Sequence, residues 1–391
     1  MSDAERLHAR LVGELASAGC LSPTWREVFA QVPRHLFIPG TVWVEEDGRT
    51  SRLNRDESPD AWLEACYDDR PVITQLDDGD GSEQGYWSSS ASMPTLVAMM
   101  LDALDLEPGM RVLEVGTGTG YNAALLAVRT GAENVTSVEV DAALAGRART
   151  SLKALGLAVT VVTGDGALGH RPSAPYDRIL STAAVQRVPY PWVQQTAAGG
   201  GIVTPWGTAF HNGALLRLRV DEDGTASGHF DGNAGFMWLR DQRTPHGAVE
   251  DRVLPDHDFT ESATELHPYS PLSDFDSSFA IGLRVPAMKS TVVFDGYAPG
   301  TGAYTVYLTD PYAGSWASWR IEPGPPPYRV RQHGPRRLFD ELTTAHRWWK
   351  EAGSPSHTRF GATVTPDEQY VWLDDPAHRV PPPLSEPAGL P

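Results

Sequence analysis

The amino-acid sequence predicts an α/β protein in which a doubly wound, mostly parallel sheet is followed by a smaller α+β domain. Three observations support this prediction. Short apolar runs alternate with helical patterns between residues 94 and 206, which is typical of parallel strands joined by crossover helices. A glycine-rich turn connects one of these strands to the next helix at 116–120. From residue 279 the composition changes, and several strand-like runs surround one helical pattern.

Composition narrows the class of protein and its partners. The 391 residues include 32 basic and 50 acidic side chains, so the net charge is −18. Such a surface repels phosphate backbones, and we expect no nucleic-acid partner. No run approaches the length of a membrane span, and no secretory signal opens the chain, so we expect a cytoplasmic protein without a membrane partner. The sequence does not indicate an oligomeric state.

Cysteine and histidine usage argues against a bound metal. Only two cysteines are present, Cys20 and Cys66, which excludes a disulfide scaffold and a four-cysteine zinc module. The twelve histidines are scattered, and no zinc-binding spacing occurs among them. We therefore expect no metal.

The segment before the predicted sheet begins with two helices. Leu7, Leu11 and Leu15 form one apolar stripe over residues 3–18, and a second, shorter helix covers 24–31. A proline-bounded extended segment follows at 32–39. The polar stretches at 45–60 and 74–87 are predicted to be loops.

The next elements follow the alternating pattern. We predict helices at 94–104, 121–130, 142–155 and 192–197. Strands are predicted at 111–116, 134–140, 159–163, 176–182 and 200–205. Two further strands, at 214–220 and 235–240, are predicted to be antiparallel and to close the sheet edge.

The remaining third has a different character. Strand-like runs occur at 279–285, 290–294, 304–308, 316–321, 328–331, 358–364 and 370–373, with one helix at 336–351. We accordingly divide the chain into a catalytic domain (1–243), a linker or draped loop (244–278), an α+β domain (279–379) and a proline-rich tail (380–391). The aromatic residues of the α+β domain suit either a peptide-binding face or the domain core; they are Tyr304, Tyr307, Tyr312, Trp316, Trp319, Trp348, Trp349 and Trp372.

Three consecutive strand ends carry the residues of a nucleoside site. Gly116, Gly118 and Gly120 let the backbone turn sharply and approach a ligand closely, at a helix N-terminus. Glu139 ends the next strand, 19 residues after Gly120, the spacing at which a carboxylate reaches the ribose hydroxyls. Asp165 ends the third strand and can accept a hydrogen bond from an adenine amino group. The alternative is a core without a nucleotide whose carboxylates lie there by chance.

The kind of adenosine ligand follows from charge. Dinucleotide sites carry Gly-x-Gly-x-x-Gly, whereas here the third glycine comes one residue early. Glu114 lies inside the strand before it, and a carboxylate disfavours a pyrophosphate but suits a cation. S-adenosyl-L-methionine has a sulfonium, an ammonium and no phosphate. The sequence therefore favours a methyltransferase over a dehydrogenase.

A series of ordered motifs resembles the protein-L-isoaspartate O-methyltransferase family over roughly residues 5–243. The motifs lie at 32–39, 67–71, 90–94, 112–121, 164–169, 176–184 and 200–207. The resemblance implies a Rossmann-like class I methyltransferase that uses S-adenosyl-L-methionine. Its substrate is then a peptide or protein with an aspartyl or isoaspartyl carboxylate.

The same resemblance implies roles for individual residues. Ser92 is the catalytic candidate, which holds the acceptor carboxylate; the alternative is a helix cap before Pro94. The implied cofactor-binding residues are Ser90, Ala91, Glu114, Gly116, Thr117, Gly118, Gly120, Tyr121, Asn122, Glu139, Val140, Asp165, Gly166 and Thr182. A carboxylate is already anionic at pH 7, so the transfer needs orientation and desolvation rather than a base.

Two departures from the family pattern lie on the acceptor side. Twenty residues separate Pro71 from Ser92, more than the family's usual spacing, and Ser89-Ser-Ala-Ser92 replaces the usual Gln-Thr-Ile-Ser. The insert holds four acidic residues, and a solvated loop is the alternative to a functional role for them. They are Asp77, Asp78, Asp80 and Glu83.

These departures lead to three hypotheses. The chain resembles actinobacterial homologues that methylate an Asp of a dedicated ribosomally made peptide, whose ester then closes to a succinimide (aspartimide). The added C-terminal domain would hold that peptide. The second hypothesis is general repair of isoaspartyl damage in proteins. The third is an S-adenosyl-L-methionine-binding interaction protein without turnover.

Overall fold

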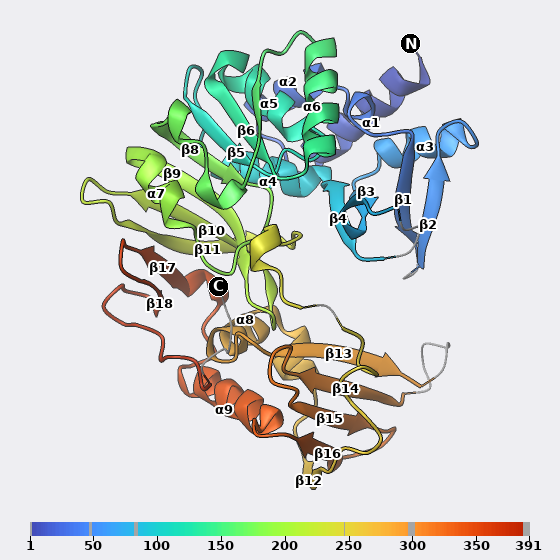
Figure 1. Ribbon diagram of the computed structural model, residues 1–391, viewed down its shortest axis with the longest axis vertical. Helices are drawn as coiled ribbons and strands as arrows, with labels where there is room; N and C mark the ends of the chain where they lie inside the picture. Colours follow the sequence, from blue (N-terminus) through green and yellow to red (C-terminus); the bar gives the residue numbers. More distant parts are fainter. Residues whose placement is uncertain (1, 47–48, 82–84, 246, 296–301, 386–391) are drawn as a thin grey trace.

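The computed structural model describes residues 2–46, 49–81, 85–245, 247–295 and 302–385. Its strands form three sheets of nine, four and five strands. The nine-stranded sheet is central (Figure 1). The four-stranded sheet lies beside it near the N-terminal helices, and the five-stranded sheet lies at the end of the molecule farthest from the N-terminus.

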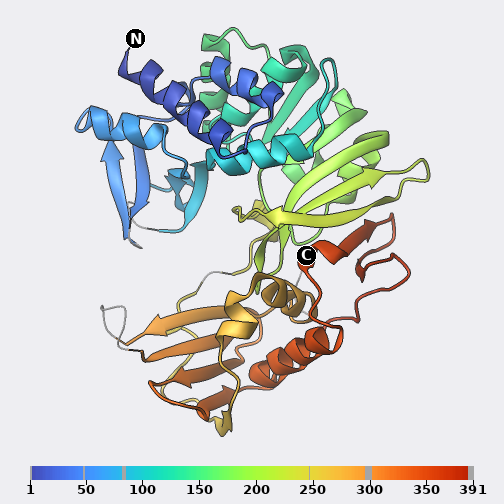
Figure 2. The same ribbon diagram turned by 180° about the vertical axis from the view of Figure 1, so that it is seen from behind.

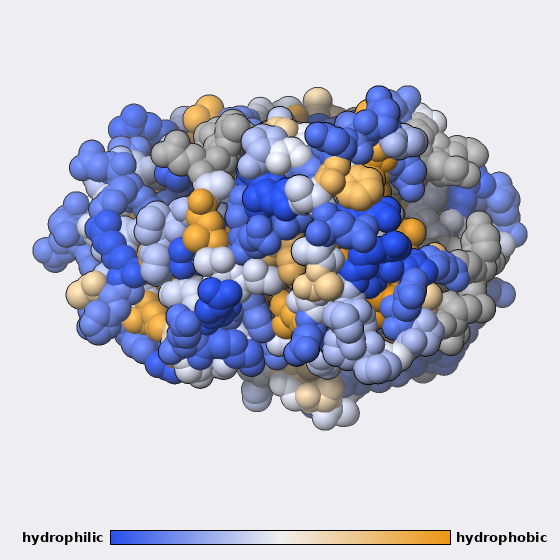
Figure 3. Space-filling model, turned by 90° about the horizontal axis from the view of Figure 1, so that it is seen from below, coloured by the Kyte–Doolittle hydropathy of each residue, from blue (hydrophilic) through white to orange (hydrophobic). Residues whose placement is uncertain are grey.

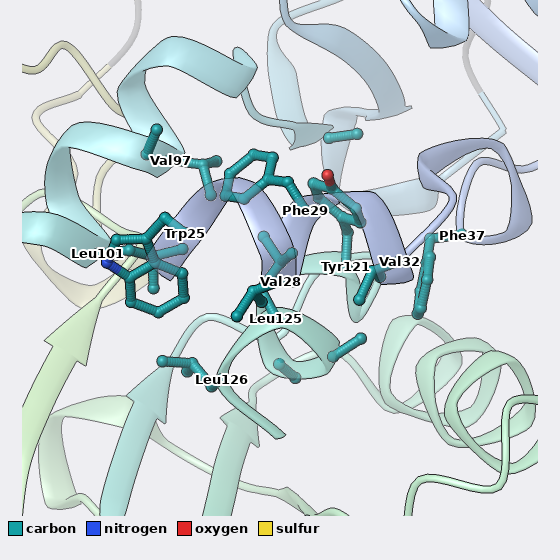
Figure 4. Close-up of a cluster of buried hydrophobic side chains, with 14 of the residues drawn as sticks. Trp25, Val28, Phe29, Val32, Phe37, Val97, Leu101, Tyr121, Leu125 and Leu126 are labelled. Carbon is teal, nitrogen blue, oxygen red and sulfur yellow. The ribbon is translucent and has the colours of Figure 1, made fainter. Parts of the chain in front are cut away.

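The two helices predicted at the start of the chain are present, and their apolar side chains belong to the cluster that covers one face of the central sheet. Helix α1 (Asp3–Ser17) begins with a capping box at Ser2, and Ser22 caps α2 (Pro23–Gln31). Figure 4 shows how apolar side chains of α2, among them Phe29, meet Tyr121 and Leu125 of the glycine-turn helix. This contact fixes the helix that follows the glycine-rich turn.

The four-stranded sheet corrects the prediction of polar loops at 45–60 and 74–87. It consists of β1 (Thr41–Glu46), β2 (Arg49–Asn54), β3 (Val72–Leu76) and β4 (Trp87–Ala91), in the order β2-β1-β3-β4, with α3 (Pro59–Cys66) between β2 and β3. Strand β2 is largely exposed, and strand β4 is serine-rich. Their polar residues therefore gave no alternating apolar signal.

The predicted parallel sheet is confirmed. Parallel strands β5 (Val112–Val115), β6 (Val135–Glu139), β7 (Thr160–Thr163), β8 (Tyr176–Ser181) and β9 (Thr196–Gly207) lie in the order β9-β8-β5-β6-β7. The helices are α4 (Pro94–Ala103), α5 (Tyr121–Thr130), α6 (Ala142–Ala154) and α7 (Tyr190–Gln195). Separate apolar clusters cover the two faces of the sheet, one with α2, α4 and α5 and the other with α7.

The antiparallel edge of the central sheet differs from the prediction. Strand β10 (Asn212–Val220) pairs with β11 (Ala226–Asn233), not with a strand at 235–240. Residues 235–240 contribute one isolated bridge, between Trp238 and Ala184. A tight turn that includes Gly224 leads directly into β11. The polar sequence of β11 did not predict a strand, so the predicted strand was placed later in the chain.

The C-terminal sheet has the order β12-β16-β15-β14-β13. Its strands are β12 (Thr260–Thr264), β13 (Lys289–Phe294), β14 (Tyr304–Thr309), β15 (Trp316–Ile321) and β16 (Tyr328–His333). Helices α8 (Phe275–Arg284) and α9 (Leu338–Glu351) share its apolar core. The predicted strand at 279–285 is wrong: this stretch belongs to α8, which Asp274 caps and which is buried around most of its surface.

Two strands predicted in the C-terminal domain return to the central sheet instead. Strand β17 (Phe360–Val364) pairs with β11, and β18 (Gln369–Leu373) pairs with β17. The expected linker contains β12, a π-helical turn (Tyr269–Ser273) and the start of α8. The division of the chain into domains stays a prediction, but these two strands connect its last part to the catalytic sheet.

The remaining short elements and the aromatic residues complete the fold. The 3-10 turns are η1 (Arg34–Leu36), η2 (Asp77–Gly79), η3 (Ala132–Asn134), η4 (Gly166–Leu168), η5 (Arg171–Ser173), η6 (Arg240–Gln242) and η8 (His357–Arg359). Trp316, Trp319, Trp349 and Trp372 are buried, which favours the core alternative for these four. None of the described helices combines the length and apolar character that crossing a bilayer requires.

Candidate active site

One pocket brings together most of the predicted site residues at the carboxyl ends of the parallel strands. It has about 910 Å³ of empty space, open mouth included, and lies between β4, the glycine-rich turn and the segment after β11. Ten predicted residues line it: Ser90, Ala91, Ser92, Gly116, Thr117, Gly118, Tyr121, Asn122, Glu139 and Thr182.

The glycine-rich turn needs its glycines for backbone conformation and for packing. Gly116, Gly118 and Gly120 have φ angles of 93°, 53° and 89°, in the region that side chains disfavour. A Cβ at Gly116 would lie 2.7 Å from the Thr182 Oγ1. The turn can therefore approach a ligand closely, as the sequence predicted.

Glu139 joins the ends of two strand–helix units. One carboxylate oxygen accepts a hydrogen bond from the Gly118 backbone N–H at 2.8 Å, and the other accepts one from the Asp141 N–H at 3.1 Å. Burial raises the pKa of Glu139. Each oxygen keeps a further lone pair, so the side chain can also accept hydrogen bonds from a diol in the pocket.

Glu114 lies behind the pocket lining. It is fully buried, and its carboxyl group accepts hydrogen bonds from the Asn122 Nδ2 at 2.6 Å and from the Ser137 hydroxyl. Burial raises the pKa of Glu114 to about 7. Because Asn122 lines the pocket, Glu114 influences the pocket through its hydrogen bond to the Asn122 amide.

Besides Glu114, four predicted cofactor residues lie outside the set that lines the pocket. Gly120 precedes α5, Gly166 is buried against Val115, and Val140 is exposed. Asp165 is exposed and accepts a hydrogen bond from the Ala167 N–H at 2.9 Å. Contacts between these residues and a cofactor stay a prediction.

The helix-cap alternative for Ser92 is not supported. Met93 is the N-cap of α4, and no side chain caps this helix by a hydrogen bond at that position. Asp69 instead accepts from the Thr95 N–H at 2.8 Å. The fully buried Arg34, which the sequence did not single out, donates to the backbone oxygen of Ser92 at 3.0 Å. Ser92 is thus held by its backbone at the pocket wall.

Asp78 of the acidic insert closes an ion-pair network at the pocket. Its carboxylate accepts hydrogen bonds from Arg243 at 2.7 and 3.0 Å and from the Tyr86 hydroxyl at 2.7 Å, and it forms an ion pair with the Arg240 Nε at 3.1 Å. Partial burial acts to raise the pKa of Asp78, but hydrogen bonds from Arg243 and Tyr86 outweigh it and leave the pKa below its ordinary value. Asp78 is therefore more than part of a solvated loop, whereas Glu83 lies outside the described residues.

The same network reaches the turn after β6. Arg240 also pairs with Asp141 at 3.2 Å, and Gln75 of β3 donates to the same Asp141 carboxylate at 2.9 Å. Three segments distant in sequence therefore meet here. We name this network, formed by Asp78, Arg240, Arg243, Asp141 and Gln75, the Asp78 clasp.

Sequence reasoning missed part of the pocket lining, including the wall that the segment after β11 contributes. The residues missed are Ser88, Ser89, Val97, Met100, Thr119, Leu144, Leu180, Ala183, Phe236, Met237, Trp238, Arg240 and Arg243. The available signal was charge: an acidic insert at 77–83 and two arginines at 240 and 243. Within the described ranges, no group of three or more His, Cys, Asp or Glu side chains is arranged to hold a metal.

Comparison with known proteins supports the family resemblance that the sequence motifs indicated. A family model described as protein-L-isoaspartate(D-aspartate) O-methyltransferase matches residues 52–244. Protein-L-isoaspartate O-methyltransferase 2 of Archaeoglobus fulgidus is 36% identical over 238 residues, 60% of this chain and 92% of that protein. A protein-L-isoaspartate O-methyltransferase of Methanothermobacter thermautotrophicus is 36% identical over 229 residues, 58% of this chain and 91% of that protein.

A solved structure extends the likeness in fold to the C-terminal part. A protein titled protein-L-isoaspartate O-methyltransferase aligns with 94% of this chain and all of its own, with a TM-score of 0.53 and 21% identity. The C-terminal part is therefore not an architecture peculiar to this chain. With the relatives covered almost to their full length, the chain belongs to the protein-L-isoaspartate O-methyltransferase family and is an S-adenosyl-L-methionine-dependent O-methyltransferase.

Proposed function

We propose that this enzyme methylates the free carboxylate of an isoaspartyl or aspartyl residue in a peptide or protein. The observation that carries the proposal is the position of Ser92. It lines the same pocket as the glycine-rich turn, its backbone is held by Arg34, and its hydroxyl does not cap α4. A hydroxyl in this place can donate a hydrogen bond to an acceptor carboxylate.

The pocket suits S-adenosyl-L-methionine by its charge and shape. The side formed by β5 and β6 carries Glu139 and, behind Asn122, Glu114. The two arginines of the lining lie in the segment after β11, and Asp78 pairs with both. This arrangement favours a cationic ligand with ribose hydroxyls over a pyrophosphate. When bound, the cofactor supplies a methyl group already activated by its positively charged sulfur.

The side chains of the protein then take little part in making or breaking covalent bonds. An acceptor carboxylate is ionised at pH 7 and needs no base. Ser92 orients one carboxylate oxygen, and the pocket excludes water from it. In the transfer, this oxygen bonds to the methyl carbon while the carbon–sulfur bond breaks and its electron pair stays on sulfur. Correct positioning of two reactants can lower the barrier by ~7–11 kcal/mol.

The methyl ester product is activated for ring closure. The backbone nitrogen of the next residue attacks the ester carbonyl, loses its proton, and methanol leaves, so that a succinimide forms. Water opens this ring to aspartyl or isoaspartyl. Repair of isoaspartyl residues is therefore one consequence of the same transfer, and the names of the relatives support isoaspartyl as the acceptor.

Modification of a dedicated ribosomally made peptide is the second candidate. The acidic insert favours it, because Asp78 pairs with Arg240 and Arg243, which line the same pocket as Ser92. The C-terminal part does not distinguish the candidates, since a solved protein titled as an isoaspartyl methyltransferase shares its fold.

A matched pair of peptides tests the proposal. The two peptides share one sequence and differ only in an aspartyl or isoaspartyl linkage, and esterification is followed by mass spectrometry. Faster methylation of the isoaspartyl peptide in several unrelated sequences supports repair. Preference for one aspartyl sequence supports a dedicated peptide. Cofactor binding without methylation of any carboxylate would favour the non-catalytic alternative.

A further inference from the structure

Strand β13 is an unprotected edge of the C-terminal sheet. Within the described part of the chain it pairs only with β14, through six consecutive residue pairs without a bulge. Val292, Val293 and Phe294 are 43%, 38% and 64% exposed. Such an edge offers free backbone hydrogen-bonding groups beside apolar side chains, which is a template for a further strand.

The usual protections of an edge are weak here. Natural edges carry proline, bulges or outward-pointing lysines, but β13 contains no proline. Its one lysine, Lys289, donates to the Pro245 backbone oxygen at 2.6 Å and is held there.

The opposite edge of the same sheet provides a contrast. Strand β12 is polar, with sequence Thr-Glu-Ser-Ala-Thr, and its Glu261 pairs with Arg331 at 2.8 Å. At the end of the molecule seen in Figure 3, apolar side chains form small patches separated by hydrophilic ones. Of the two edge strands, β13 therefore carries the exposed apolar side chains and β12 is polar.

Strand β13 also lies on the side of the C-terminal sheet that faces the catalytic part, as Figures 1 and 2 show from opposite sides. The lysine contact connects it to the pocket, because Pro245 is two residues from Arg243, which lines the pocket wall. The segment from Arg243 to Pro245 therefore leads from the pocket wall to the side chain of the first residue of β13.

We propose that the free edge of β13 binds an extended segment of the peptide substrate by strand addition while its carboxylate lies in the pocket. Backbone hydrogen bonds would supply affinity, and the apolar side chains would favour β-branched or aromatic residues at alternate positions of the substrate. Binding a distal segment raises the effective concentration of the carboxylate at the pocket. This inference rests on the proposed function, since it requires a peptide acceptor.

A charge on the edge tests the proposal. Val293→Lys blocks β13, and Ala263→Lys places the same charge on β12 as a matched control. Methylation is measured on a short acceptor peptide of about six residues and on a long one of about 20 residues with an apolar extended flank. We expect Val293→Lys to raise the KM of the long peptide roughly tenfold, the effect of losing about 1.4 kcal/mol. The KM of the short peptide and the cofactor Kd stay unchanged, and Ala263→Lys changes none of these values.

Equal KM values for the long peptide in the wild type and in Val293→Lys would overturn the proposal. So would a wild-type dimer, detected by analytical ultracentrifugation, that Val293→Lys converts to a monomer, since a second copy would then occupy the edge. If Val293→Lys unfolds at a lower temperature than the wild type, Phe294→Ser replaces it, because this side chain is more exposed. Failure of the proposed function looks different: the wild type then binds cofactor but methylates neither peptide.

Discussion

Removal of the Glu139 carboxylate is the most direct perturbation of the cofactor side. In Glu139→Ala, the Gly118 and Asp141 backbone N–H groups lose their acceptor, and so would the ribose hydroxyls that we expect this carboxylate to hold. We expect weaker binding of S-adenosyl-L-methionine in a protein that still folds, because the glycine-rich turn keeps its contacts to β5 and α5.

The size of the effect depends on the bonds that are lost. A hydrogen bond to a charged group contributes ~1.5–3 kcal/mol. If one such bond to the ribose is lost without replacement, the lower figure applies. The upper figure applies if the glycine-rich turn also loosens and loses contact with the cofactor. The expected rise in Kd is therefore roughly 10- to 150-fold.

Isothermal titration calorimetry measures this change. Titrations are repeated at increasing pH, because burial raises the pKa of Glu139 and the carboxylate must be ionised. Glu133→Ala, which removes an exposed glutamate close in sequence, is the matched control and should bind as the wild type does. An unchanged Kd in folded Glu139→Ala would refute the assignment of this residue to the ribose.

Four further predictions concern the acceptor side, the buried acid and the C-terminal strands. Ser92→Ala should lower kcat with cofactor Kd and thermal stability kept, whereas wild-type turnover would remove Ser92 from the site; Ser17→Ala, at an exposed position at the end of α1, is the control. Because burial raises the pKa of Glu114 from 4.5 to about 7, its contribution to stability is complete below pH 4.5 and is lost as pH rises through 7. Affinity for the cationic cofactor should rise over that interval, and Glu114→Gln should flatten both profiles, as measured by thermal unfolding and calorimetry. Asp78→Asn should cost about 1 kcal/mol of stability and raise the KM of the peptide, while Asp56→Asn on the surface should do neither; unchanged stability and KM in Asp78→Asn would dismiss the clasp. Truncation after residue 243 should give insoluble protein, because β17 covers the edge of β11 and Phe360 belongs to the apolar core; a soluble truncated chain with native cofactor affinity would contradict this.

Local sequence patterns were sufficient to predict the parallel sheet and most of the residues at its carboxyl end that line the pocket. A buried strand, a turn of three glycines and an amphipathic helix are encoded within about 20 residues, and the strand order brings Gly118 and Glu139 together. Helix α5 begins and ends where the periodicity predicts, because Gly120 and Gly131 flank it.

Long-range pairing explains what could not be predicted. Strand β17 belongs to the central sheet because its register matches β11, more than 130 residues earlier, and nothing local in either strand specifies that partner. The run at 279–285 has the composition of a strand, but Asp274 starts a helix ahead of it. Likewise the Asp78 clasp joins three segments that were predicted separately, a polar loop at 74–87, the start of a helix at 142 and a strand at 235–240, and nothing local in any of them specifies the others.

The function proposed for this pocket is the transfer of a methyl group from S-adenosyl-L-methionine to a carboxylate. The most direct test is a single-turnover reaction with isotopically labelled methyl donor and an isoaspartyl peptide, followed by fragmentation of the product and mild alkali treatment. We predict label on the isoaspartyl carboxylate as an ester, which alkali releases as methanol. Label on a nitrogen or sulfur atom, or no label despite bound cofactor, would contradict it.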